Sequence, residues 1–170
     1  RDEWRTYFEA ERAAAENGEL AELPIKQLAD RRIWKVYHSV MKEGGAIDAS
    51  SPAEALHELR ITCKKLRYLL EFFQSLYPPK PLGKLVKSLK TFQNVLGEFQ
   101  DTEVQSQAIL AFGREMAAAG VAPVETQMAM GMVADSILQR QTGARRDFDA
   151  HFEAFSRRAI RKSFARLFKT

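Results

Sequence analysis

The stretch HELRITCKKLRYLLEFF, residues 57–73, joins one histidine and four Lys or Arg side chains to a block of leucine and phenylalanine. On a helical wheel the apolar side chains in and just before it share one face: Leu56, Leu59, Cys63, Leu66, Leu70 and Phe73. A stripe beside that face holds His57, Arg60, Lys64, Arg67 and Tyr68, whereas Lys65 lies off the stripe. The pattern predicts an amphipathic helix whose basic side chains border a cleft.

The residues before this stretch indicate where the helix begins. Pro52 suits the first helical position, because the N–H that it lacks has no partner there. Glu54 follows Ser51 by three residues, which is the spacing of a capping box. We therefore expect the helix to begin at Pro52, with the Ser51 hydroxyl capping its free amides.

The rest of the chain shows the same helical periodicity and almost no strand pattern. Helices are expected at about residues 2–17, 25–43, 52–77, 81–119, 123–155 and 158–168, separated by Gly and Pro. A helix over residues 81–119 would be roughly 60 Å long at about 1.5 Å per residue, so a bend or break is expected near Gly113 or Gly120. The predicted fold class is all-α, an up-and-down bundle of four or more long antiparallel helices.

The composition is that of one ordinary globular domain spanning residues 1–170, with 45% hydrophobic and 28% charged residues. The single cysteine, Cys63, has no partner for an internal disulfide. No uncharged apolar run reaches the roughly 18 residues of a membrane span, and no signal segment opens the sequence. A cytoplasmic protein without a membrane partner is expected.

Basic and acidic zones alternate along the chain. Residues 57–90 contain eight Lys and Arg against two Glu, and residues 140–170 contain nine against three acids. Two further helices carry basic stripes, one with Arg31, Lys35, His38 and Lys42, the other with Lys87 and Lys90 beside Asn94 and Asp101. Such stripes often simply face solvent. However, like charges four residues apart on one helix repel each other by a few tenths of a kcal/mol per pair. A polyanion would relieve that repulsion.

Signatures of enzymes and of sequence-specific nucleic-acid binding are absent from the sequence. It contains no phosphate-binding Gly-rich loop, nucleophile elbow or paired-cysteine spacing. Glu54 and His57 match one E-x-x-H motif, but a di-iron bundle needs two, so no metal or other cofactor is expected. No helix-turn-helix, zinc finger or interleaved aromatic row is present. The remaining hypothesis is a binding protein for an anion.

Two blocks of the sequence resemble a known family. His57-Glu-Leu-Arg60-Ile-Thr-Cys-Lys64-Lys65-Leu-Arg67-Tyr68, followed by Leu96-Gly97-Glu-Phe-Gln-Asp101, is similar to the paired signatures of the CHAD family, the conserved histidine α-helical domain. The resemblance implies a helical domain that binds inorganic polyphosphate through a basic groove or pore, often at polyphosphate granules. Matching the family's basic signature assigns His57, Arg60, Lys64, Lys65 and Arg67 to that site, and the helical wheel adds Arg31, Lys35, Lys87 and Lys90.

The sequence departs from the family pattern in one respect. CHAD domains usually contain two similar four-helix halves, whereas this chain shows one such block, resembles the C-terminal half and begins at Arg1. We expect a fragment of a longer domain. Either one half binds through an open face, or a second copy of the chain completes the groove as a homodimer.

The predicted function is non-catalytic binding of inorganic polyphosphate. The alternative is a helical adaptor that binds an acidic protein or RNA through the same basic face. A polyphosphatase would need a metal–carboxylate cluster, which the sequence does not reveal.

Overall fold

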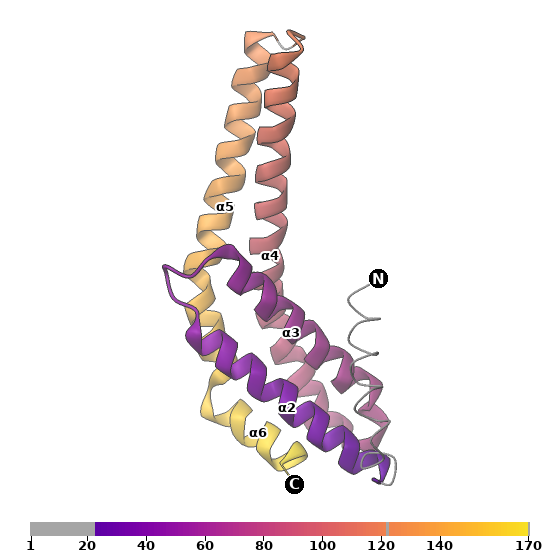
Figure 1. The fold of residues 1–170 in the computed structure, drawn as a ribbon. Coiled ribbons are helices and arrows are strands. Elements are labelled where there is room, and N and C mark those ends of the chain that lie inside the picture. The colour runs from indigo at the N-terminus through magenta and orange to yellow at the C-terminus, as the bar shows by residue number, and fades with distance from the viewer. Residues whose placement is uncertain (1–22, 122, 170) are drawn as a thin grey trace.

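The computed structural model describes residues 23–121 and 123–169, and the helix expected at residues 2–17 lies outside them. The described residues form five α-helices: α2 (Ile25–Ala46), α3 (Ala53–Phe72), α4 (Pro79–Ala118), α5 (Val124–Ser156) and α6 (Arg158–Phe168). A short 3-10 helix, η1 (Gln74–Leu76), precedes α4. The predicted all-α bundle of long antiparallel helices is confirmed for this part of the chain (Figure 1).

The helix α4 is longer and less interrupted than the sequence suggested. It begins at Pro79, since the first turn tolerates prolines that lack an N–H, and it continues through Gly113 to Ala118. Of the two positions expected for a bend or break, Gly113 shows none. The chain reverses at the other, near Gly120, whose φ of +68° lies in the left-handed region that glycine adopts without strain.

The outer halves of α4 and α5 form a two-helix hairpin that projects beyond the other helices (Figure 1). A continuous α4 is therefore compatible with shorter neighbours, because they pack only against its first half. No helix in the described ranges is long and apolar enough to cross a membrane.

The core lies where α3 packs between α2 and α4, with α5 and α6 closing the bundle. Leu59, Cys63 and Leu66 on α3 are fully buried, as the helical wheel predicted. An aromatic cluster joins the C-terminal helices to this core, since Phe164 of α6 stacks on Tyr37 of α2 with ring centroids 3.9 Å apart. The helices are thus fixed mainly by buried apolar side chains.

One charged group is buried in this core. Asp30 of α2 is 1% exposed, and it accepts a 2.8 Å hydrogen bond from the Tyr77 hydroxyl and a 2.7 Å bond from Lys26. Burial and the neighbouring Asp30 carboxylate raise the pKa of Tyr77 well above its ordinary value. The phenol therefore remains a hydrogen-bond donor at physiological pH.

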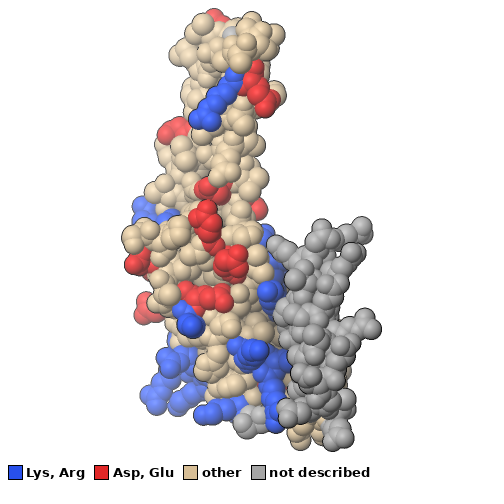
Figure 2. Space-filling model, viewed as in Figure 1, with Lys and Arg blue, Asp and Glu red and all other residues tan. Residues whose placement is uncertain are grey.

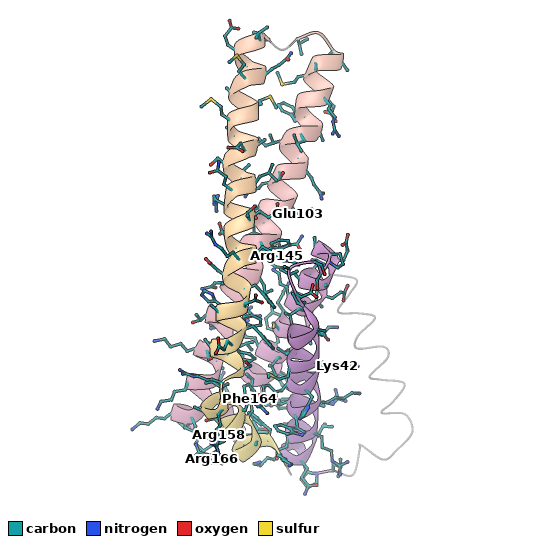
Figure 3. All side chains as sticks on the ribbon, turned by 90° about the vertical axis from the view of Figure 1, so that its left-hand side faces the viewer. Lys42, Glu103, Arg145, Arg158, Phe164 and Arg166 are labelled. Carbon is teal, nitrogen blue, oxygen red and sulfur yellow. The ribbon has the colours of Figure 1, made fainter. Side chains whose placement is uncertain are left out.

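The loop before α3 corrects the predicted capping box. Pro52 occupies the N-cap position, with no side-chain cap hydrogen bond. The Ser51 hydroxyl instead accepts a 2.9 Å bond from the Asp48 amide and donates a 3.1 Å bond to the Asp48 carboxylate. Arg145 of α5 donates bonds of 2.6 and 2.5 Å to the carbonyls of Asp48 and Ser51, tying this loop to the bundle (Figure 3). Ser51 thus builds the turn before the helix.

Candidate functional site

The basic stripe of α3 faces the polar side of α4 across a groove of about 700 Å³. We call it the α3–α4 groove; its lining residues are Arg60, Lys64, Arg67, Lys90, Gln93, Asn94, Gly97, Glu98 and Asp101. The apolar faces of both helices are buried in the core, which turns these polar side chains together toward the groove. A depression thus lies beside the α3 stripe.

Arg67 has an unusual environment within the groove. Its Nε is buried and has no hydrogen-bond partner among the residues that the structure describes, and its guanidinium carbon lies 5.0 Å from the centre of the Tyr68 ring. A buried N–H without a partner costs roughly 1–3 kcal/mol. The side chain is thus held in place by packing and a cation–π contact.

The groove also contains two carboxylates, those of Glu98 and Asp101. Glu98 accepts hydrogen bonds of 3.0 and 2.5 Å from the Nε and terminal nitrogen of Arg140 on α5. This pairing offsets the negative charge of Glu98. Four cationic residues therefore face Asp101 and a carboxylate already paired from outside the groove, which favours an anionic ligand.

The groove continues toward the first turns of α4. A second depression of about 480 Å³ shares Lys90 and Asn94 with the first and adds Lys87, Gln74 and Glu71. Glu71 of α3 pairs with Lys90 of α4 at 3.1 Å across this junction. Both partners are partly exposed, so the pair is weak and an incoming anion can compete for Lys90.

His57 lies on the same helix face but is not among the lining residues of the α3–α4 groove. Its Nδ1 forms a 2.7 Å hydrogen bond with Oε1 of Gln100 on α4. This bond joins α3 to α4 beside the groove. The histidine predicted to contact a ligand is thus placed where it also fixes the spacing of the two helices.

The remaining predicted site residues lie elsewhere. Arg31 and Lys35 line a separate depression of about 570 Å³ with Gln27, Trp34 and Phe168. Burial raises the pKa of Glu43 on α2, and the positive charge of Lys65 partly opposes that rise. Lys65 thus lies on the α2 side of α3. The structure therefore unites Arg60, Lys64, Arg67 and Lys90 in one groove and Lys87 in its continuation, but not Arg31, Lys35 or Lys65.

Three lining residues were missed by the sequence analysis: Gln93, Gly97 and Glu98. Their signal was the spacing of three or four residues from Lys90, Asn94 and Asp101, which places them on one face of α4. Gly97 leaves the groove open, because a Cβ built there meets no atom within 4 Å. Gly97 is uncharged, so a search for basic stripes does not select it.

Other reactive side chains do not add to the groove. Burial raises the pKa of the Cys63 thiol far above its ordinary value, so it acts as an apolar core residue. Within residues 23–121 and 123–169, no group of three or more His, Cys, Asp or Glu is placed to hold a metal ion.

Comparison with known proteins identifies the family. A search of curated proteins found no significant match. The family model described as CHAD domain matches residues 1–110. This range includes every lining residue of the α3–α4 groove. The chain therefore belongs to the CHAD family.

Proposed function

We propose that this chain binds inorganic polyphosphate in the α3–α4 groove without catalysing a reaction. The observation that carries the proposal is that four cationic residues, Arg60, Lys64, Arg67 and Lys90, line one groove. Glu98, one of the two acids there, is already paired with Arg140. Phosphate oxygens would accept charge-assisted hydrogen bonds from these cations. Membership in the CHAD family supports the same ligand.

Each cation has a distinct task in this mechanism. Arg60 and Arg67 present planar guanidinium groups that bind two phosphate oxygens at once, whereas Lys64 and Lys90 act as point charges. Lys90 exchanges the carboxylate of Glu71 for a phosphate. The release of counterions from the polymer drives association, so binding weakens as salt is added. His57 stabilises the spacing of the helices through its hydrogen bond with Gln100.

The lining of the groove favours a phosphate chain over nucleic acid. The nine lining residues within the described part of the chain are charged, amide-bearing or glycine, with no aromatic ring among them. Single-stranded nucleic acids gain roughly 1–3 kcal/mol for each base stacked on an aromatic side chain. Polyphosphate has no bases, so its binding does not depend on aromatic side chains for stacking.

The test is a double charge reversal, Arg60→Glu with Lys64→Glu. Binding of long-chain polyphosphate should weaken at least about tenfold, because two charge-assisted contacts of roughly 1.5–3 kcal/mol each are lost. The matched control is Arg146→Glu with Lys162→Glu, which changes the net charge equally at exposed residues outside the groove. Circular dichroism should show equal helicity in all three proteins.

Three outcomes would contradict the proposal. If the groove variant bound polyphosphate as tightly as the control, the site would be wrong. If long polyphosphate failed to displace RNA or an acidic protein at matched charge, the adaptor function would replace polyphosphate binding. Release of orthophosphate in the presence of Mg²⁺ would contradict the non-catalytic role.

We also propose a cytoplasmic location at polyphosphate granules, which follows from the ligand. A second copy of the chain could cover the open groove as a homodimer. Mass measurement with and without polyphosphate tests this, because a completed groove requires the dimer to form or persist with the ligand bound.

A further inference from the structure

A second basic groove lies on the other side of α4, against the end of α5 and the whole of α6. We call it the α4–α6 groove; it measures about 750 Å³. Its basic residues come from three helices and the junction of α5 with α6: Lys80, Lys84, Lys87, Arg157 and Arg166, with His151 beside them. Leu85, Phe155 and Ile160, which belong to the buried core, form its floor.

The charge of this groove is more one-sided than that of the first. Among its lining residues there is no Asp or Glu, whereas the α3–α4 groove includes Glu98 and Asp101. Figure 2 shows Lys and Arg gathered at this end of the molecule, whereas the charged patches on the projecting hairpin are mostly Asp and Glu. In Figure 3, Arg158 and Arg166 project from α6 at the same end. A concave surface with charges of one sign concentrates counterions of the other.

The positions of these cations oppose the helix dipoles. Lys80 and Lys84 lie in the first turns of α4, and Arg157 precedes the first residue of α6; neither helix has an acid in its first turn. A helix N-terminus carries partial positive charge, so a cation there costs a few tenths of a kcal/mol or more. An anion held between the two helices would offset that repulsion, because it attracts both the cations and the helix N-termini.

His151 also lines the groove. Its Nδ1 donates a hydrogen bond to the carbonyl oxygen of Asp147 in its own helix at 2.9 Å. The ring is therefore oriented by α5, and five Lys and Arg side chains supply the positive charge of the groove.

The two basic grooves meet on α4. Lys87 and Thr91 line both the α4–α6 groove and the continuation of the α3–α4 groove. The geometry points to a second phosphate-binding site in the α4–α6 groove, which a long polyphosphate chain reaches by crossing α4 at Lys87. This inference rests on the proposed function and adds that the protein distinguishes long chains from short ones. His151, Arg157 and Arg166 lie outside the residues that match the CHAD domain.

Chain length is the variable that reveals the second site. A helix with its side chains is about 10–12 Å across, which is more than tripolyphosphate can span, so this short chain occupies one groove at a time. Two tripolyphosphate molecules should bind each protein molecule. A long chain that enters both grooves gains affinity, because the second contact becomes intramolecular.

The experiment tests the double variant Lys84→Glu with Arg166→Glu in calorimetric titrations. Its control is Arg114→Glu with Arg146→Glu, which reverses two exposed cations outside both grooves. The groove variant should bind one tripolyphosphate instead of two and bind long chains at least about tenfold more weakly. The slope of log K against log salt should become shallower by about 1.4, or about 0.7 for each lost contact. The control should keep the wild-type stoichiometry.

The possible failures are distinct. If the Lys84 and Arg166 variant kept two tripolyphosphate sites and the wild-type affinity for long chains, the second site would be refuted and the proposed function would stand. If Arg60→Glu with Lys64→Glu changed nothing while the Lys84 and Arg166 variant lost all binding, the α4–α6 groove would be the site and the proposed location would fall. If the wild-type protein bound no polyphosphate, both proposals would fail.

Discussion

Nδ1 of His57 and Oε1 of Gln100 form a 2.7 Å hydrogen bond that joins α3 to α4 beside the basic groove. Neither residue lines that groove. The bond instead holds the two helices that carry the cations at a constant separation.

The first prediction concerns this bond. Gln100→Leu should lower the free energy of unfolding by about 0.5–1.5 kcal/mol, because one intramolecular hydrogen bond is lost. The affinity for polyphosphate should change less than about threefold, since the groove cations remain. Chemical denaturation and a binding titration check the two effects. A large loss of affinity with unchanged stability would instead show that Gln100 orients His57 toward the ligand.

The second prediction concerns the buried carboxylate of Asp30. Tyr77→Phe removes the 2.8 Å donor to Asp30, and stability at pH 8 should fall by about 1–3 kcal/mol because a buried acceptor loses its partner. The raised pKa of Tyr77 means that the folded state retains the phenol proton more strongly than the unfolded state. The advantage of wild type over Tyr77→Phe is therefore fully present below the unfolded pKa of about 10 and declines above it. Denaturation of both proteins at pH 8 and pH 10.5 would disprove this if the difference grew with pH.

The third prediction uses two adjacent glycines of α2. A Cβ added at Gly44 would lie 2.3 Å from Cε2 of Phe152, whereas one added at Gly45 meets nothing within 4 Å. Phe152 is stacked on Phe148 with ring centroids 6.0 Å apart, which limits its movement. Gly44→Ala should thus destabilise the protein by about 1–3 kcal/mol through overpacking. Gly45→Ala, the matched control, should be neutral or stabilise by up to about 1 kcal/mol. Equal melting temperatures for the two variants would contradict the close packing of α2 on α5.

The fourth prediction fills the α3–α4 groove without changing its charge. Gly97 lies among its lining residues, and a side chain there meets no obstacle. Gly97→Ala should raise stability by up to about 1 kcal/mol, because alanine is the better helix former, with binding retained. Gly97→Trp should weaken binding of long-chain polyphosphate at least about tenfold while the protein stays folded, because the indole occupies space that the phosphate chain needs.

Binding isotherms and melting curves for the two Gly97 variants separate occlusion from unfolding. A Gly97→Trp protein that binds as well as Gly97→Ala would place the ligand outside the groove.

Much of the helical framework was predictable from the sequence, because helical periodicity repeats within a few residues. The apolar face of α3 was assigned correctly from Leu59, Cys63 and Leu66, which the structure buries completely. The stripe with Arg60, Lys64 and Arg67 follows from the same periodicity and lines the groove. Of the two glycines at which a break was expected, only Gly120 marks one. Gly113 does not interrupt the helix, because the outer half of α4 pairs with α5 and needs no shorter neighbour beside it.

The sequence by itself determined which side of each helix is apolar and which is basic, since a side chain's position around its own helix depends only on local spacing. Only the tertiary structure decided which basic sides meet. Packing placed Arg67 and Lys90 in one groove, set Arg31 and Lys35 apart, and brought Lys84 of α4 to the same groove as Arg166 of α6. Contacts between residues so distant in the chain depend on how the helices pack against one another, which no local pattern encodes.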